Sequence, residues 1–233
     1  MASQSPMADW INEVKPEDVT FLQTLQESAN SVVFKVTVHG RVCVMKVYHD
    51  REPSEFDSPV FEVNLFVCES TAYRRLKANG LCERGVIPDF YGTIEKIQPA
   101  LWPGLHMFCG DDLPPKAILI EYIPNMKPID LSNFSKDYLV KFRQILDDIH
   151  QAGVLHADTK PRNMVISQGE QDRVLWIDFD SAQTFPQGSS LSERQEGWFR
   201  EENEIVDYFI EALAQDFEEG RINRTFHYYY EYN

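Results

Sequence analysis

The sequence has few basic residues for its length, and this shortage limits the partners that it can have. It contains 22 Lys and Arg against 37 Asp and Glu, which gives a formal net charge of −15 at pH 7. A surface of this sign repels the phosphates of nucleic acids and the headgroups of anionic lipids. We therefore expect neither nucleic acid nor a membrane among its partners.

Long apolar runs and paired cysteines are also lacking. No stretch is apolar enough over the length that a bilayer requires, and the first 18 residues contain acids and prolines where a secretory signal would be basic and then apolar. The cysteines are scattered and lack the close pairs typical of structural zinc sites; they are Cys43, Cys68, Cys82 and Cys109. These absences favour a reduced, cytoplasmic setting.

What the sequence does contain is a pattern of strands followed by helices. Its hydrophobic content of 43% over 233 residues suffices for one domain or two closely packed lobes. Alternating apolar residues predict strands, with His39-Gly40 as a tight turn, at 19–25, 32–38, 41–48, 89–97 and 117–123. Helical spacing predicts a helix over 61–78 and a second from Ser135 that ends before Gly153.

The later part of the chain adds a loop, a hairpin and a helix. The loop 98–115 is longer than most connections, and 163–167 with 174–179 read as the two strands of a hairpin. The final helix is expected from Glu201, with one apolar face formed by Ile205, Phe209, Leu213 and Phe217. Together these elements predict an α+β protein.

The densest chemical signal is the segment His156-Ala-Asp-Thr-Lys-Pro-Arg-Asn163, followed after the hairpin by Asp178-Phe-Asp180. Phosphoryl transfer needs a carboxylate beside the accepting hydroxyl and a lysine near the moving phosphate. It also needs an amide and a carboxylate that hold magnesium. The segment supplies all four groups.

In order and spacing this segment resembles the catalytic loop H-R-D-L-K-x-x-N and the metal motif D-F-G of the protein kinase superfamily. The resemblance implies that Asp158 orients or deprotonates the acceptor hydroxyl and that Lys160 neutralises charge on the transferred phosphate. It also implies that Asn163 and Asp178 bind Mg2+ beside ATP. We expect His156 to brace the loop.

Upstream residues extend the resemblance to the nucleotide. Val44-Met-Lys46 is similar to the family's V-A-I-K, whose lysine pairs with the α- and β-phosphates of ATP, and Glu69 would be its ion-pair partner, with Glu62 as a competitor. The resemblance places the adenine of ATP between the apolar residues Val33, Val44 and Val165. It places the hinge, which would hydrogen-bond the edge of the adenine, at Glu121 and Ile123.

Several positions depart from the family pattern. The glycine-rich loop falls on 26–33, where Gln26, Ser28 and Ser31 replace the glycines, so Ser28 and Ser31 would hold phosphate less closely. Ala157 replaces the arginine that pairs with a phosphorylated activation loop, which argues against that regulation. Asp180 replaces the glycine of D-F-G, as in aminoglycoside and choline kinases, and no A-P-E motif follows.

The resemblance covers residues 19–217 and is greatest to short protein-kinase-like proteins of filamentous fungi. It implies an N-terminal extension (1–18), a small β-rich N-lobe (19–123) and a shortened, mainly helical C-lobe (124–233) of a two-lobed kinase-like fold. The implied function is ATP- and magnesium-dependent transfer of phosphate to a hydroxyl of a protein (Ser/Thr) or of a small molecule. The alternative is a pseudokinase that works as a binding or scaffold module.

Overall fold

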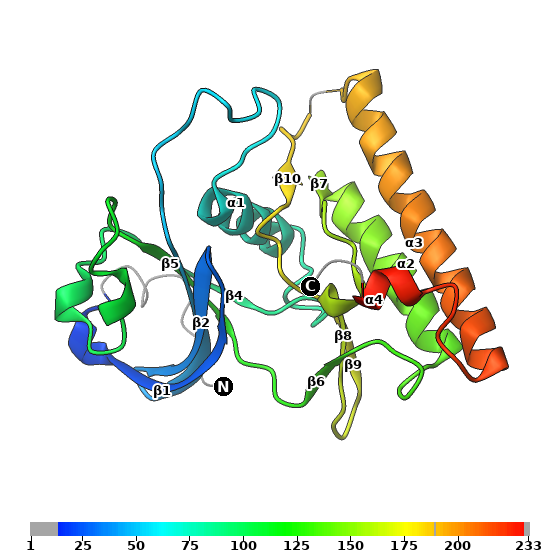
Figure 1. Cartoon of the computed structure of the whole chain (residues 1–233), viewed down its shortest axis with the longest axis horizontal. Coiled ribbons are helices and arrows are strands. Elements are labelled where there is room, and N and C mark those ends of the chain that lie inside the picture. The colour runs from blue at the N-terminus through cyan, green and yellow to red at the C-terminus, as the bar shows by residue number, and fades with distance from the viewer. Residues whose placement is uncertain (1–13, 189, 231–233) are drawn as a thin grey trace, which may run out of the picture. The chain divides into compact units, whose positions relative to one another are not determined.

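The computed structural model describes residues 14–188 and 190–230, which form a mixed α+β structure (Figure 1). The described residues divide into two compact units: one holds 14–70 together with 89–122, and the other holds 71–88 together with 123–188 and 190–230. The sequence instead predicts 71–88 as part of the first lobe. Of the expected N-terminal extension, residues 1–13 lie outside the described part, and the 3-10 helix Pro16–Asp18 leads directly into the first strand.

The first unit is built on one antiparallel sheet of five strands in the order β1-β2-β3-β5-β4 (Figure 1). Its strands are β1 (Val19–Glu27), β2 (Ser31–Val38), β3 (Arg41–Tyr48), β4 (Phe90–Ile94) and β5 (Lys116–Glu121). His39 and Gly40 join β2 to β3 with φ values of 48° and 80°, the left-handed pair that a two-residue hairpin prefers. The predicted meander and its turn are therefore confirmed, whereas β4 is shorter than the predicted 89–97.

The long loop of the first unit, residues 98–115, contains short helices and packs on the sheet. It contains two 3-10 helices, Pro99–Leu101 and His106–Phe108. Trp102, Leu105 and Phe108 are buried in the same apolar cluster as the inward-facing residues of β2 and β3. The loop that the sequence left without structure thus closes the core of this unit.

Helix α1 (Leu65–Ala78) begins four residues later than the sequence predicted. The side-chain oxygen of Asn64 accepts a hydrogen bond of 3.1 Å from the backbone N–H of Val67, which is the geometry of a helix N-cap. Apolar spacing extended the prediction to Phe61, but the cap at Asn64 determines where the helix begins.

The second unit is mainly helical, with two small sheets. Its helices are α2 (Lys136–Gln151), α3 (Glu193–Glu219) and α4 (Phe226–Tyr230). One sheet has the order β6-β8-β9, with strands Met126–Pro128, Met164–Ser167 and Arg173–Trp176, and the other pairs β7 (Val154–Leu155) with β10 (Gln183–Thr184). The predicted hairpin is β8 with β9, and Gly153, with a φ of 76°, follows α2 as expected.

Helix α3 differs from its prediction in both start and buried face. It begins at Glu193, where Ser192 and Gln195 form a reciprocal capping box, and not at Glu201. Phe209 and Leu213 are buried as expected, but Ile205 and Phe217 are 47% and 46% exposed. No helix within 14–188 and 190–230, α3 included, is long and apolar enough to cross a membrane.

Candidate functional site

A buried ion pair connects the sheet of the first unit with helix α1. Lys46 Nζ lies 2.8 Å from Glu69 Oε2, and the two residues are only 7% and 1% exposed. Tyr48, two positions along β3 and so on the same face as Lys46, donates its hydroxyl to Glu69. Glu62, the competing partner, instead accepts hydrogen bonds from the backbone N–H groups of residues 63 and 64.

The valines expected around adenine in the first unit share a sheet face with Lys46. Val33 on β2 is the direct partner of Lys46 on β3, and Val44 precedes Lys46 by two residues. Since side chains alternate along a strand, Val33, Val44 and Lys46 lie on one face. At the end of β5, Glu121 accepts a hydrogen bond of 3.1 Å from the backbone N–H of Asp89.

The turn between β1 and β2 uses its polar groups internally. Ser28 Oγ accepts hydrogen bonds from the backbone N–H groups of Asn30 and Ser31, at 3.2 and 3.1 Å, and donates to the carbonyl of Ser31. In a glycine-rich loop, backbone N–H groups of this kind hold phosphate. A phosphate at this turn therefore competes with the Ser28 hydroxyl.

In the second unit, the catalytic-loop segment brings its acid and its amide together. Asn163 Nδ2 donates to the Asp158 carboxylate at 2.9 Å and to the Asp158 carbonyl at 2.8 Å. Arg162 binds the same carboxylate oxygen at 2.7 Å. The 3-10 helix Pro161–Asn163, which begins just after the partly buried Lys160, folds the loop so that these groups meet.

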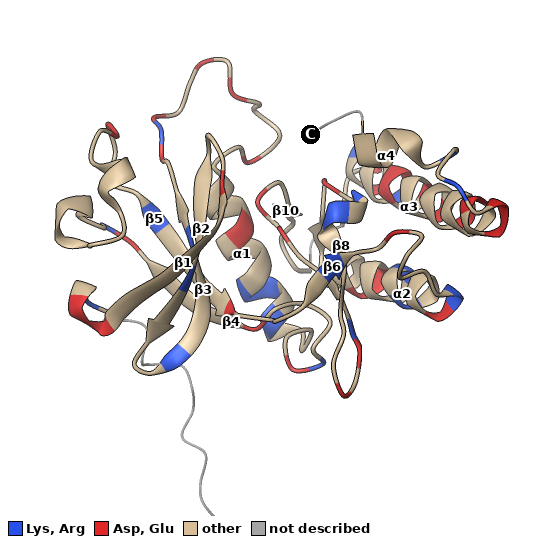
Figure 2. Cartoon of the chain, turned by 60° about the horizontal axis from the view of Figure 1, so that its bottom comes forward, with Lys and Arg blue, Asp and Glu red and all other residues tan. Residues whose placement is uncertain are grey.

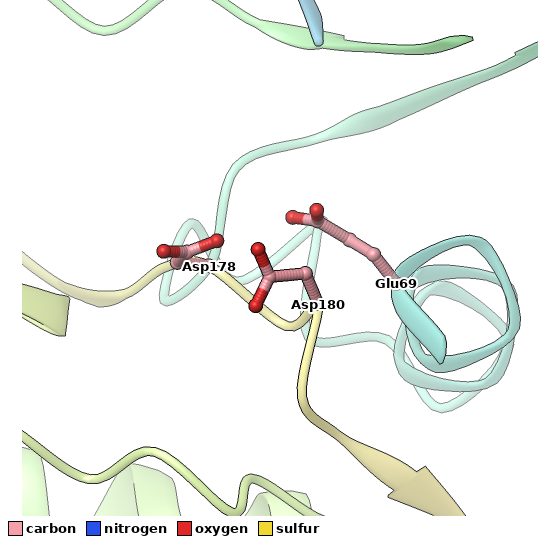
Figure 3. A group of neighbouring side chains, drawn as sticks. All are labelled: Glu69, Asp178 and Asp180. Atoms are coloured by element: carbon pink, nitrogen blue, oxygen red, sulfur yellow. The ribbon is translucent and has the colours of Figure 1, made fainter. Parts of the chain in front are cut away.

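A second pair of carboxylates follows β9. Asp178 and Asp180 lie on the loop after this strand, and their side chains are drawn in Figure 3. One carboxylate oxygen of Asp178 lies within 4.8 Å of one of Asp180. Asp178 has a φ of 66°, a left-handed conformation that is uncommon for non-glycine residues but that aspartate adopts more readily than most.

Asp178, Asp180 and Asn163 carry oxygens of the kind that suits magnesium. The backbone N–H of Ile177 donates to the carbonyl of Asn163 at 3.1 Å, which fixes the loop of Asp178 beside the 3-10 helix. The two side-chain bonds of Asn163 use Nδ2, so Oδ1 is the atom with which it would bind a metal. A carboxylate pair and an amide oxygen are ligands that Mg2+ prefers. The sequence predicts Asn163 and Asp178 as metal ligands, and Asp180, whose carboxylate lies near that of Asp178, is a further candidate.

The two remaining residues expected around adenine are buried in the second unit. Ile123 and Val165 are 3% and 2% exposed and pack with Leu175 and Ile177 in one small apolar cluster. Val165 lies on β8, in the hairpin that precedes Asp178.

Glu202 of α3 is a residue of the site that sequence reasoning missed. It is buried, and its carboxylate accepts hydrogen bonds from the backbone N–H groups of Ala157 (2.6 Å) and His156 (3.1 Å) and from His150 Nε2 (2.6 Å). Ala157 has a φ of 62°, so Glu202 holds a strained backbone immediately before Asp158. An acid in an acidic amphipathic helix gives little sign of this role in the sequence.

Electrostatics keeps Glu202 charged. Burial alone would raise the pKa of its carboxyl group, but the hydrogen bonds from His150 and from the amide of Ala157 outweigh burial and lower the pKa.

His156 contributes packing and geometry to the loop. Its ring is fully buried between Trp176 and Phe179, and Nε2 donates to the carbonyl of Ile177. Its Nδ1 accepts from the backbone N–H of Asp158 at 3.3 Å. The ring thus braces Asp158 from behind, the role that the sequence suggested.

Comparison with known proteins adds no family to this geometry. No protein-family model matches the chain, and no curated protein matches it in sequence. The chemical assignment of these residues therefore rests on their types, spacing and contacts.

Proposed function

We propose that the chain is a phosphotransferase with a two-lobed kinase-like fold that moves the terminal phosphoryl group of ATP to a hydroxyl. The observation that carries the proposal is the buried pair of Lys46 and Glu69. Burying an ion pair contributes little to stability, because desolvation of both charges offsets their attraction. A lysine held in this way is better explained by a ligand that needs a fixed positive charge beside it, such as the negatively charged phosphates of ATP.

The residues of the second unit support the chemical part of the proposal. Asp158, held by Asn163 and Arg162, would accept the proton of the acceptor hydroxyl as the acceptor oxygen forms the new bond to phosphorus. The bond from phosphorus to the bridging oxygen of ADP breaks in the same step, so the products are the phosphate ester, ADP and a proton. Lys160 would offset charge on the moving group.

Asn163, Asp178 and Asp180 would hold magnesium, which supplies charge neutralisation on the phosphate oxygens. The experiment that tests the proposal is calorimetric titration with ATP, in buffer with magnesium and in buffer with EDTA. We expect tighter binding with magnesium and loss of that difference in Asp178→Asn. The exposed loop residue Asp112 provides a control, Asp112→Asn, with the same change of charge. Nucleotide binding that does not respond to magnesium would contradict the proposal.

A second candidate function, a pseudokinase-type binding module, is favoured by one observation. The backbone N–H groups of Asn30 and Ser31 are already bonded to Ser28, so the turn lacks the open amides of a phosphate loop. Ser28→Gly separates the two functions. In the phosphotransferase it frees these amides and strengthens ATP binding, whereas in a binding module it leaves ATP binding absent.

A further inference from the structure

A pocket of about 300 Å³ lies beside the catalytic loop, entirely within the second unit. Its walls are the loop residues 157–160, Ile205 of α3, and His227 and Tyr228 of α4. The exposure of Ile205, unexpected for an apolar residue of α3, arises because its side chain faces this space. The volume lies at the lower limit of small-molecule sites.

The wall formed by α4 is firmly held, although this helix has only five residues. Asp216 of α3 is fully buried and accepts hydrogen bonds from the backbone N–H groups of Asn223, Arg224 and Thr225 at 2.9 to 3.0 Å. Burial would raise the pKa of Asp216, but these bonds outweigh burial and hold the pKa well below its usual range. A charged Asp216 therefore folds the chain back after α3.

Aromatic contacts complete the attachment of α4. The Tyr229 hydroxyl donates to the carbonyl of Ile129 at 2.8 Å, and the ring of Tyr228 packs on Phe209 with 5.1 Å between centroids. Tyr228 therefore reaches the pocket from a fixed position.

The charges around the pocket do not suit a cationic ligand. Among the described residues that line it, Asp158 is the single carboxylate, and it is already paired with Arg162 at 2.7 Å. Lys160 adds a positive charge to the wall. An ammonium group in this pocket would lose its hydration without an unshared carboxylate in return. Ile205, Ala157 and the ring of Tyr228 instead offer apolar surface.

We infer that this pocket binds the phosphate acceptor, and that the acceptor is a small uncharged alcohol with an aliphatic or aromatic body. The inference rests on the proposed function and specifies its substrate class. The hydroxyl of the alcohol meets Asp158 and gives up its proton there as its oxygen bonds to phosphorus, while the apolar body lies against Ile205 and Tyr228. This class differs from the amine-bearing substrates of aminoglycoside and choline kinases, which the sequence resembles at Asp180.

The test combines transfer and binding on the full chain. 2-Phenylethanol and 1,6-hexanediol represent uncharged alcohols, choline an ammonium alcohol, and a mixture of serine and threonine peptides a protein acceptor. Phosphate ester is measured by phosphorus NMR with magnesium and ATP, and alcohol binding by saturation-transfer NMR without ATP. We expect the two uncharged alcohols to bind and to be phosphorylated in preference to choline and the peptides.

A pair of matched variants locates the site. Ile205→Trp fills the pocket, and we expect it to raise the KM for 2-phenylethanol about tenfold or more, by direct steric conflict, while the KM for ATP changes less than about twofold. Val140 on α2 is 54% exposed and outside the pocket, so Val140→Trp should change neither value. A similar KM for the alcohol in wild type and Ile205→Trp would overturn the assignment of this pocket.

The outcomes separate this inference from the proposed function. Transfer to peptides or choline, with no binding or phosphorylation of the uncharged alcohols, overturns the inference and keeps the phosphotransferase. Magnesium-dependent ATP binding without alcohol binding also overturns the inference about the acceptor and keeps the phosphotransferase. If ATP does not bind, the proposed function fails and the acceptor role of the pocket fails with it, even when the alcohols bind.

Discussion

Lys46 and Glu69 place opposite charges where almost no water reaches them, and this burial makes their contributions to stability and to function separable. The carboxylate of Glu69 also accepts a hydrogen bond from the Tyr48 hydroxyl, but its ion pair is with Lys46. Removing one member of a buried pair costs about 3–5 kcal/mol, because the other charge is left uncompensated, whereas replacing both by apolar residues is often neutral.

We therefore predict that Lys46→Met lowers the free energy of unfolding by about 3 kcal/mol. The double variant Lys46→Met/Glu69→Met should recover most of this loss, and both variants should lose phosphate transfer. Urea unfolding and ATP turnover measured on the same preparations would check this. A double variant that transfers phosphate as fast as the wild type would remove the pair from the mechanism.

Asp158 allows the chemical step to be tested apart from nucleotide binding. Asp158→Asn keeps an oxygen for Asn163 Nδ2 but loses the proton acceptor, so turnover should fall by about 10²–10⁴ while ATP affinity stays unchanged. Turnover by single-turnover assay and affinity by calorimetry provide the two measurements. If turnover and affinity fall together, Asp158 acts on the nucleotide and not on the acceptor.

At the scale of elements, α3 links a titratable group to the geometry of the catalytic loop. Glu202 accepts the backbone N–H groups of His156 and Ala157 and carries a lowered pKa. A carboxyl group with a pKa lowered by folding stabilises the native state above its unfolded pKa, near 4.5, and this stabilisation is lost as the pH falls through the folded pKa.

We predict that Glu202→Gln lowers the free energy of unfolding by about 2 kcal/mol at pH 7, since the amide presents N–H where backbone donors need an acceptor. The difference from wild type should shrink at pH 3, below 4.5, because Glu202 of the unfolded chain then binds a proton that the native carboxylate binds less readily. Urea unfolding at both values measures it, with the exposed Glu204→Gln as the control on the same helix. A difference that is independent of pH would show that the charge of Glu202 is not involved.

How well the sequence predicts an element depends on what fixes that element. The meander from β1 to β3 follows from alternation in the sequence, and the hairpin turn from His39-Gly40, so both could be predicted. Helix starts depend on single caps: Asn64 begins α1, and Ser192 with Gln195 begins α3, where Gly197 interrupts the apolar spacing.

The contacts of the candidate site also differ in how well the sequence predicts them. Asp158 and Asn163 are near in sequence, and their contact follows from their spacing. Glu202 reaches the catalytic loop from a helix that is distant in sequence, and α4 is held by Asp216 through a turn with no apolar period. Contacts of this kind depend on tertiary packing, which local patterns do not encode.

At the scale of the whole molecule, the excess of acids is the dominant property. The net charge is −15, and acidic positions follow one another along α3 (Figure 2). Self-repulsion of like charges destabilises a compact state, and salt screens it with a Debye length of about 10 Å at 0.1 M.

We predict that the melting temperature rises by about 2–4 °C between 0.02 and 0.5 M NaCl, which corresponds to about 1 kcal/mol for a chain of this size. Differential scanning calorimetry at several NaCl concentrations would measure the change. A melting temperature that falls with salt would mean that surface ion pairs such as Arg143 with Asp207 outweigh the repulsion.

The order of strands in the first unit also has a consequence for synthesis. In the finished sheet β5 pairs with β3, yet α1, β4 and the long loop separate the two strands in the chain. Because the ribosome adds about 5–20 residues per second, the edge of β3 that later pairs with β5 remains unpaired for several seconds. Because that edge is rich in buried apolar residues, the newborn chain is open to pairing with another strand until β5 arrives. Slower translation of this interval should therefore increase aggregation of the nascent protein, which a yield comparison between fast and slow codons over 49–115 would reveal.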